Sequence, residues 1–150
     1  MNTDRIEKQV VLRAPRARVW RAIVNAEEFG EWFRVKLEGA FVEGATIRGK
    51  ITYPGYEHVS MALQIDRIEP EHYFAYRWHP YAVDPSVDYS SEATTLVEFR
   101  LDDSDGGTLL TIVESGFDQI PLARRDKALR MNDQGWAEQT RNIERHVSQP

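Results

Sequence analysis

A change of hydrophobic periodicity near residue 117 constrains the fold of this chain more than any other feature. Over residues 35–101 and 108–117 apolar residues mostly alternate with polar ones, the two-residue period of a strand with one buried face. After that point large apolar residues recur every seven positions, at Leu122, Leu129, Trp136 and Ile143. A seven-residue interval keeps side chains on one stripe of a helix. The sequence therefore predicts antiparallel strands followed by one long helix that continues past Val147.

The residues before this sheet predict one more strand and two short helices. Residues 6–12 alternate like a strand, and Pro15 suits the first turn of a helix, where a backbone N–H has no helical partner. Asn25 can end this helix and cap a second one, which carries Phe29, Trp32 and Phe33. The terminal helix is then the only element long enough to cover the concave face of the sheet. We predict an α+β fold formed by a single domain over residues 1–150.

Several segments, taken in order, resemble the START/Bet v 1-like (SRPBCC) superfamily. They are residues 10–22 with Trp32, residues 44–47, 74–78 and 114–117, and the Gly135-Trp136 pair. More narrowly, the chain resembles bacterial single-domain proteins related to the C-terminal domain of the activator of Hsp90 ATPase. The resemblance covers almost the whole chain and implies a helix-grip fold. In that fold a curved antiparallel sheet of six to seven strands follows the first strand and two short helices, and a long C-terminal helix lies over its concave face.

The resemblance also implies a function, namely a non-catalytic protein that holds a small hydrophobic or aromatic ligand between the sheet and the C-terminal helix. No cofactor is expected. Two alternatives stay open. One is a co-chaperone-like, Hsp90-related protein-interaction module with a chaperone as its partner. The other is an enzyme of the polyketide cyclase or hydrolase type that uses Glu114 as acid or base.

The candidate ligand pocket centres on two tryptophans, Trp78 on the sheet and Trp136 on the covering helix. Ligand pockets are mainly apolar with a few placed polar groups, but tryptophans also fill ordinary cores, so both interpretations of these two residues stay open. Trp20 is interpreted as core. A mid-helix glycine is unfavourable by about 1 kcal/mol relative to alanine, so we interpret Gly135 as allowing close approach to the sheet. The candidate pocket residues are Tyr53, Met61, Tyr76, Trp78, Glu114, Phe117, Met131, Asn132 and Trp136.

Glu114 is the most informative charged residue, because its orientation decides its chemistry. It is in phase with Leu110 and Ile112, which would turn it inward, while the competing phase of Leu109 and Val113 would send it to solvent. Alternation alone does not choose between the two, and the family resemblance favours the inward orientation. In an apolar site desolvation raises the pKa of a carboxyl group, as a general acid or a site for a polar ligand group requires.

Two loops carry further expectations. Residues 79–91 form a long link with an aromatic and apolar surface, and loops above ~12 residues are usually functional or disordered. A lid over the pocket and a contact in a homodimer both fit this link. Residues 102–107 are acidic and end in two glycines, which we interpret as a hairpin loop, since the glutamate of a calcium loop is missing.

Composition and motifs exclude several classes of function. The chain has no cysteine, which excludes disulfides and thiolate sites and favours a cytoplasmic location. A net charge of −5 is the wrong sign for nucleic-acid binding, and no apolar run approaches the ~18 residues of a membrane span. The amino terminus does not read as a signal peptide. No metal site is expected, because the histidines lack metal-ligand spacing; they are His58, His72, His79 and His146.

Overall fold

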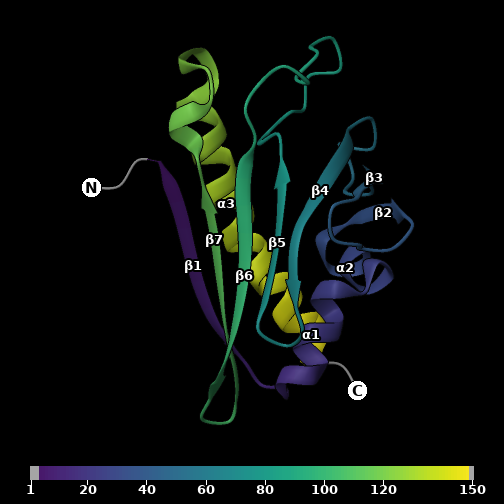
Figure 1. Cartoon of the computed structure of the whole chain (residues 1–150), viewed down its shortest axis with the longest axis vertical. Helices are drawn as coiled ribbons and strands as arrows, with labels where there is room; N and C mark the ends of the chain where they lie inside the picture. Colours follow the sequence, from purple (N-terminus) through teal and green to yellow (C-terminus); the bar gives the residue numbers. More distant parts are fainter. Residues whose placement is uncertain (1–3, 149–150) are drawn as a thin grey trace.

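The computed structural model describes residues 4–148 and shows one antiparallel, curved sheet with a long C-terminal helix beside it (Figure 1). The α+β helix-grip fold predicted from the sequence is confirmed. The strand order is β1-β7-β6-β5-β4-β3-β2. The strands are β1 (Arg5–Leu12), β2 (Val35–Glu38), β3 (Thr46–Ile51), β4 (Ser60–Glu69), β5 (Tyr73–Trp78), β6 (Thr95–Ser104) and β7 (Gly107–Ser115).

The helices occupy the predicted places along the chain. They are α1 (Arg16–Val24), α2 (Ala26–Phe33) and α3 (Leu122–Ser148), with a short 3-10 helix η1 (Phe117–Gln119) before α3. Asn25 separates α1 from α2, and its side-chain oxygen accepts a 3.0 Å hydrogen bond from the backbone N–H of Glu28. This is the usual N-cap interaction, which satisfies an N–H that has no partner inside the helix.

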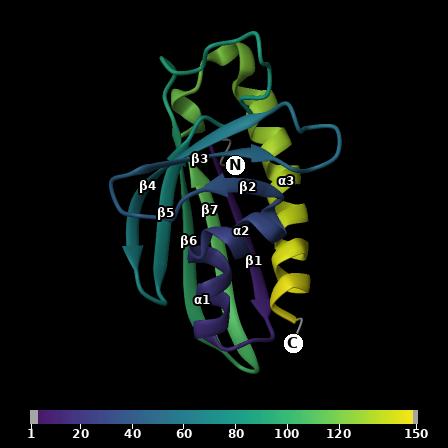
Figure 2. The same cartoon turned by 90° about the vertical axis from the view of Figure 1, so that its right-hand side faces the viewer.

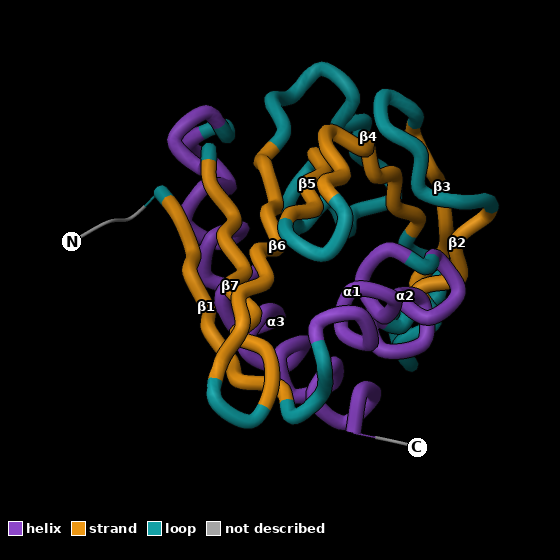
Figure 3. Tube along the Cα trace, turned by 60° about the horizontal axis from the view of Figure 1, so that its bottom comes forward, coloured by secondary structure: helices purple, strands orange, loops and turns teal. Residues whose placement is uncertain are grey.

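The three helices lie on the same side of the sheet, as the turned view shows (Figure 2). Helices α1 and α2 follow strand β1 and contact each other and α3, whereas the first half of α3 has no helix beside it (Figures 1 and 2). The loop between β5 and β6 rises at the same end of the molecule as the start of α3 (Figure 1). The sheet curls around the space in between (Figure 3). The space under α1 and α2 is therefore covered differently from the space under the start of α3.

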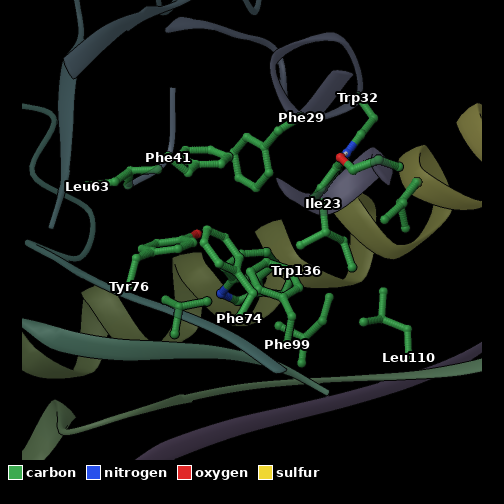
Figure 4. Close-up of a cluster of buried hydrophobic side chains, with 14 of the residues drawn as sticks. Ile23, Phe29, Trp32, Phe41, Leu63, Phe74, Tyr76, Phe99, Leu110 and Trp136 are labelled. Carbon is green, nitrogen blue, oxygen red and sulfur yellow. Dashed lines mark hydrogen bonds between the residues drawn. The ribbon is translucent and has the colours of Figure 1, made fainter. Parts of the chain in front are cut away.

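Aromatic side chains fill the space beneath α1 and α2, and we call them the packed region (Figure 4). Its members, none more than 9% exposed, are Phe29, Phe41, Phe74, Tyr76 and Phe99. Phe74 and Phe99 face each other across the β5–β6 pair with ring centroids 5.9 Å apart. The ring of Phe29 lies 5.5 Å from that of Phe41 in an edge-to-face arrangement. These are the separations at which aromatic rings attract one another, so this part of the interior is a closed core.

The prediction that Leu122 belongs to the buried stripe of the long helix is wrong. Leu122 is 80% exposed, because it is the first residue of α3 and the buried face of the helix begins later, at Ala128. Trp136 and Ile143 are buried as the seven-residue interval predicts, and Leu129 is partly buried. Val147, which continues the stripe, is also buried.

The predicted hairpin loop over residues 102–107 is shorter in the structure. Strand β6 continues to Ser104, which pairs with Gly107, so only Asp105 and Gly106 form the turn. Gly106 has a φ of 82°, a conformation that glycine adopts without the steric cost of a Cβ atom. At Gly107 a Cβ atom would lie 2.0 Å from the carbonyl oxygen of Leu12, so a side chain is excluded there.

Candidate functional site

A cavity of about 410 Å³ opens between the sheet and the middle of α3, next to the packed region. Strands β4 and β5 supply one wall through Met61 and Trp78, and α3 supplies the other. Its rim is formed by the loops on either side, with Tyr53 and Tyr56 in one and residues 79–83 in the other. The volume lies within the usual range for small-molecule sites.

Three aromatic rings meet where the cavity borders the packed region. The rings of Trp78 and Trp136 have centroids 5.9 Å apart and planes tilted by 36°. Phe33, the last residue of α2, lies 6.0 Å from each of them. Phe33 also stacks on Phe29 at 5.0 Å, so it forms the boundary between the packed region and the cavity.

Glu114 holds the two tryptophans from behind the cavity wall. Its Oε2 accepts hydrogen bonds from Trp78 Nε1 at 2.7 Å and Thr95 Oγ1 at 2.5 Å, and its Oε1 accepts one from Trp136 Nε1 at 2.8 Å. Asn132 Nδ2 donates to both oxygens, at 3.0 and 3.2 Å. The carboxyl group thus connects β5, β6, β7 and α3, and it fixes the orientation of both indoles.

Glu114 is fully buried, and its surroundings act on its pKa in two opposite ways. Desolvation disfavours the charged form and raises the pKa, while the hydrogen bonds from Thr95, Trp78, Trp136 and Asn132 favour the charged form. The net shift is upward. No Lys, Arg or His side chain within residues 4–148 forms an ion pair with it.

Tyr76 brings a second buried polar group close to Glu114. Its side chain is fully buried among the rings of the packed region (Figure 4), and its hydroxyl has no hydrogen-bond partner among the described residues. Burial and the neighbouring charge of Glu114 both hold the pKa of the Tyr76 phenol well above its usual value. The phenol is therefore neutral at physiological pH.

The loop between β5 and β6 is attached to α3 by one arginine. Arg124, in the first turns of α3, donates from Nε to Glu92 at 2.8 Å and from Nη1 to the carbonyl oxygen of Pro80 at 2.8 Å. Its guanidinium also lies 4.7 Å from the ring centroid of Tyr89. Tyr81, on the same loop, borders the cavity with a φ of 50°, a backbone conformation that is unusual for a tyrosine. The loop thus borders one side of the cavity.

The sequence model of a family described as Activator of Hsp90 ATPase homolog 1-like protein matches residues 13–148. The chain belongs to this family. No protein in a search of curated sequences matches it.

Solved structures agree with this family assignment at the level of the fold. MLL2253 from Mesorhizobium loti is 19% identical, with a TM-score of 0.75 and 96% of each chain covered. The Aha1 dimer from Colwellia psychrerythraea is 14% identical, with a TM-score of 0.70, 93% of this chain and 92% of that one covered. DynU16, from the dynemicin biosynthetic locus, is 21% identical with a TM-score of 0.74; the match covers 97% of this chain but only 47% of DynU16, so the present chain spans about half its length.

In this family member the candidate pocket residues divide into two groups. Tyr53, Met61, Trp78, Met131, Asn132 and Trp136 line the cavity. Tyr76, Glu114 and Phe117 do not. Tyr76 is enclosed by the aromatic core, Glu114 lies behind the indoles, and Phe117 is buried in η1. Glu114 nevertheless points inward, in phase with Leu110 and Ile112.

The cavity also contains residues that the sequence analysis did not include. Phe33 is the last residue of α2, and Tyr56 and Tyr81 lie in loops. The aromatic content of residues 79–91 was the one signal for Tyr81, whereas the conformation that brings Tyr56 to the rim has no signature in the sequence.

Gly135 has a different role from the predicted one. A Cβ atom at this position would meet nothing within 4 Å, so close approach to the sheet does not explain the glycine. Gly135 lines the cavity, and the absence of a side chain leaves that part of it open.

Within residues 4–148 no group of three or more His, Asp or Glu side chains is arranged to hold a metal ion. His79 contacts the carbonyl oxygen of Glu92, and His146 pairs with Glu28. No helix of this part of the chain is long and apolar enough to cross a membrane.

Proposed function

We propose that this protein binds a small apolar or aromatic molecule in the cavity between the sheet and α3. The observation that carries the proposal is the cavity wall itself. Phe33 and Trp78 present aromatic surface to a space of about 410 Å³, with the almost fully buried Trp136 beside them, although the aromatic region next to it is fully packed. Apolar surface left uncovered in this way is unfavourable in water and is a common feature of ligand sites.

The indoles are also held in place before any ligand arrives. Both N–H groups donate to the same buried carboxyl group, at 2.7 and 2.8 Å. A wall fixed in this way loses little conformational entropy on binding, which favours affinity. Polar groups around the apolar surface, such as Asn132, Gln139 and Tyr53, can orient a ligand.

Binding is a better account than catalysis by Glu114. The carboxyl group is fully buried, and its oxygens are already bonded by four side chains. A general acid or base must come within hydrogen-bond distance of the atom on which it acts. Glu114 can meet that condition only if Trp78 or Trp136 moves aside.

The experiment is a fluorescence titration with 1-N-phenylnaphthylamine, a neutral aromatic probe whose emission rises in an apolar site. We expect saturable binding to the wild-type protein and at least about tenfold weaker binding to Gly135→Phe, because the new ring occupies the open space beside Gly135. The urea midpoint of Gly135→Phe should be no lower than that of the wild type, since glycine is the poorer helix former.

The matched control is Leu122→Phe, which adds the same ring to the same helix at an exposed position outside the cavity. It should bind the probe as the wild type does. Equal binding by Gly135→Phe and Leu122→Phe would show that the probe does not use this cavity, and no saturable binding to any of the proteins would remove the proposal.

Partners and location are also proposals. Since one structural neighbour is an Aha1 dimer, dimerisation of this chain is worth testing by light scattering after size exclusion. A chaperone partner is the second candidate function, because the family is described by homology to an activator of Hsp90 ATPase. It would be tested by direct binding of the purified chain to Hsp90. The cytoplasmic location stays a prediction from the sequence.

A further inference from the structure

The buried charge of Glu114 has no positive partner within the described part of the chain. Every group that contacts its carboxyl oxygens is a neutral donor, namely two indole N–H groups, a hydroxyl and an amide. Buried carboxylates are normally paired with a cation or coordinate a metal. Neutral donors stabilise the ionised form but leave its net charge uncompensated.

The cavity lies on the other side of the same side chains. Trp78, Asn132 and Trp136 contact Glu114 and also line the cavity, so one layer of side chains separates the carboxyl group from a ligand. No Lys or Arg among residues 4–148 lines the cavity. The lining includes one histidine, His79, and one carboxylate side chain, the exposed Glu138.

Three positive side chains among residues 4–148 contact the rim, and none of them lines the cavity. Arg34 lies 5.5 Å from the ring centroid of Tyr53, Lys127 lies 5.8 Å from that of Tyr81, and Arg124 donates to the carbonyl oxygen of Tyr81 at 3.3 Å. No comparable contact to Phe33, Trp78 or Trp136 is present in residues 4–148. No cation among the described residues therefore occupies these rings, and the partly buried Phe33 and Trp78 offer ring surface next to the almost fully buried Trp136.

The indole faces suit such a cation. Tryptophan is the aromatic residue that attracts cations most strongly, through the negative face of its ring. A carboxylate that accepts the indole N–H pushes electron density into the ring, and this makes the face more negative. Because Trp78 and Trp136 both donate to Glu114, the effect applies to both walls.

We propose that the cavity selects apolar cations, such as an aromatic or alkyl ammonium, with the charged nitrogen against Trp78 and Trp136 and the Glu114 carboxylate behind them as its countercharge. This inference rests on the proposed function and specifies the chemical class of the ligand. It gives Glu114 a role in selectivity that does not require contact with the ligand.

Selection of a cation is the opposite of the usual preference of an apolar site for neutral ligands. A cation loses its hydration on entering such a site, so a neutral molecule of the same shape ordinarily binds more tightly. Only a negative potential in the wall reverses that order. Whether the cation or the neutral molecule of the same shape binds more tightly therefore shows whether the cavity wall carries a negative potential.

The test compares two ligands of nearly identical shape, 2-naphthyltrimethylammonium and 2-tert-butylnaphthalene, by displacement of 1-N-phenylnaphthylamine from the wild-type protein. At about pH 8, where the ionised form of Glu114 is most populated, we expect the ammonium to bind at least about tenfold more tightly than the hydrocarbon. Equal affinities, or tighter binding of the hydrocarbon, overturn the inference while leaving the proposed function intact. Binding of neither ligand, nor of the probe, removes both.

Variants then assign the preference to one residue. In Glu114→Gln the ratio of the two affinities should fall to about one or below, because the preference for the ammonium disappears whatever change the two ligands share. The matched control is Glu138→Gln at the exposed rim, where solvent screens the charge, and it should keep the preference. A preference for the ammonium that survives Glu114→Gln contradicts the role of Glu114.

A second measurement, of the pKa of Glu114 in the wild-type protein, does not depend on whether Glu114→Gln folds. Coupling between ligand binding and ionisation is reciprocal, so a cation that binds the ionised form more tightly must lower the pKa of Glu114. Carbon-13 NMR of the glutamate carboxyl groups in the wild-type protein should show this shift with the ammonium and no shift with the hydrocarbon. The titratable groups near it are the Tyr76 phenol, His79 and Glu138, which are followed in the same titration. An unchanged pKa with bound ammonium overturns the inference.

Discussion

The packed region and the cavity are made of the same kinds of side chain and share a strand, yet one is filled and the other is open. On β5, Phe74 and Tyr76 are fully buried in the packed region, whereas Trp78, two residues further on, lines the cavity. The difference lies in what covers them. Helix α2 places Phe29 against the ring of Tyr76 (Figure 4), whereas Gly135 of α3, which lines the cavity together with Trp78, has no side chain to fill the space.

The two regions also treat polar groups differently. In the packed region the Tyr76 hydroxyl is buried without a partner among the described residues. Beside the cavity a whole carboxyl group is buried, but four side chains donate to it. A buried carboxyl group is tolerated where hydrogen-bond donors surround it, as the four donors surround Glu114. The cavity wall therefore differs from the packed region in having a fully hydrogen-bonded polar group behind it.

The largest expected effect separates the two regions by stability. Phe99→Ala should lower the free energy of unfolding by about 3–5 kcal/mol, because it leaves a hole in a closed core. Met61→Ala, on the half-buried cavity wall, should cost less than about 1.5 kcal/mol, because its side chain already borders empty space. Urea denaturation measures both. Equal losses would mean that the cavity is not open in solution.

The next effect concerns Glu114. Glu114→Gln replaces one acceptor oxygen with an NH₂ group that faces other donors, so at neutral pH we expect a loss of about 1–3 kcal/mol.

The pH dependence of that loss has a definite sign. Because burial raises the pKa of Glu114 above that of the unfolded chain, its contribution to stability is complete at low pH and decreases as pH rises through the folded pKa. The cost of Glu114→Gln should therefore be larger near pH 4 than near pH 8 in urea denaturation series. A cost that grows with pH would show that the hydrogen bonds outweigh desolvation and hold the pKa low.

A smaller effect of opposite direction is expected at Tyr76. Tyr76→Phe removes a buried hydroxyl that lacks a partner and keeps the ring, so stability should rise by about 1 kcal/mol. Thermal unfolding measures the change, with Tyr73→Phe as the control, because the Tyr73 hydroxyl donates to Glu98 at 2.5 Å and its loss should destabilise. A loss of stability in Tyr76→Phe would indicate a hydrogen bond, for instance to water, in the packed region.

The smallest effect is expected at Gly135. Gly135→Ala should raise stability by up to about 1 kcal/mol, since the added methyl group meets no neighbouring atom and alanine favours the helix. Probe binding should be retained. A loss of stability would show that α3 lies closer to the sheet than the structure places it.

The elements of the fold were predictable because their periodicity is unambiguous. Alternation over residues 35–101 predicted strands with one buried face, and in β4 Leu63 and Ile65 are buried while Gln64 and Asp66 are exposed. The seven-residue interval predicted a helix with one apolar stripe, on which Trp136 and Ile143 are buried. Both signals depend on one buried face per element.

The candidate site was only partly predictable, for two physical reasons. Strand β7 is buried on both faces, with Thr111 and Val113 less than 9% exposed on the side opposite Leu110 and Ile112, so alternation could not fix the direction of Glu114. The opening of the cavity depends on loops that are not periodic, such as the one that places Tyr81 at the rim with a positive φ.

The comparison of the two regions is tested most directly by the indole N–H signals in a nitrogen-15 NMR titration with 1-N-phenylnaphthylamine. Trp78 and Trp136 donate to Glu114 at the cavity wall, whereas Trp32 donates to the carbonyl oxygen of Ala22 at 2.8 Å, away from the cavity. We expect the signals of Trp78 and Trp136 to shift in a saturable way and that of Trp32 to stay in place. If the probe binds and the Trp78 and Trp136 signals do not move, the cavity between the sheet and α3 is not the binding site.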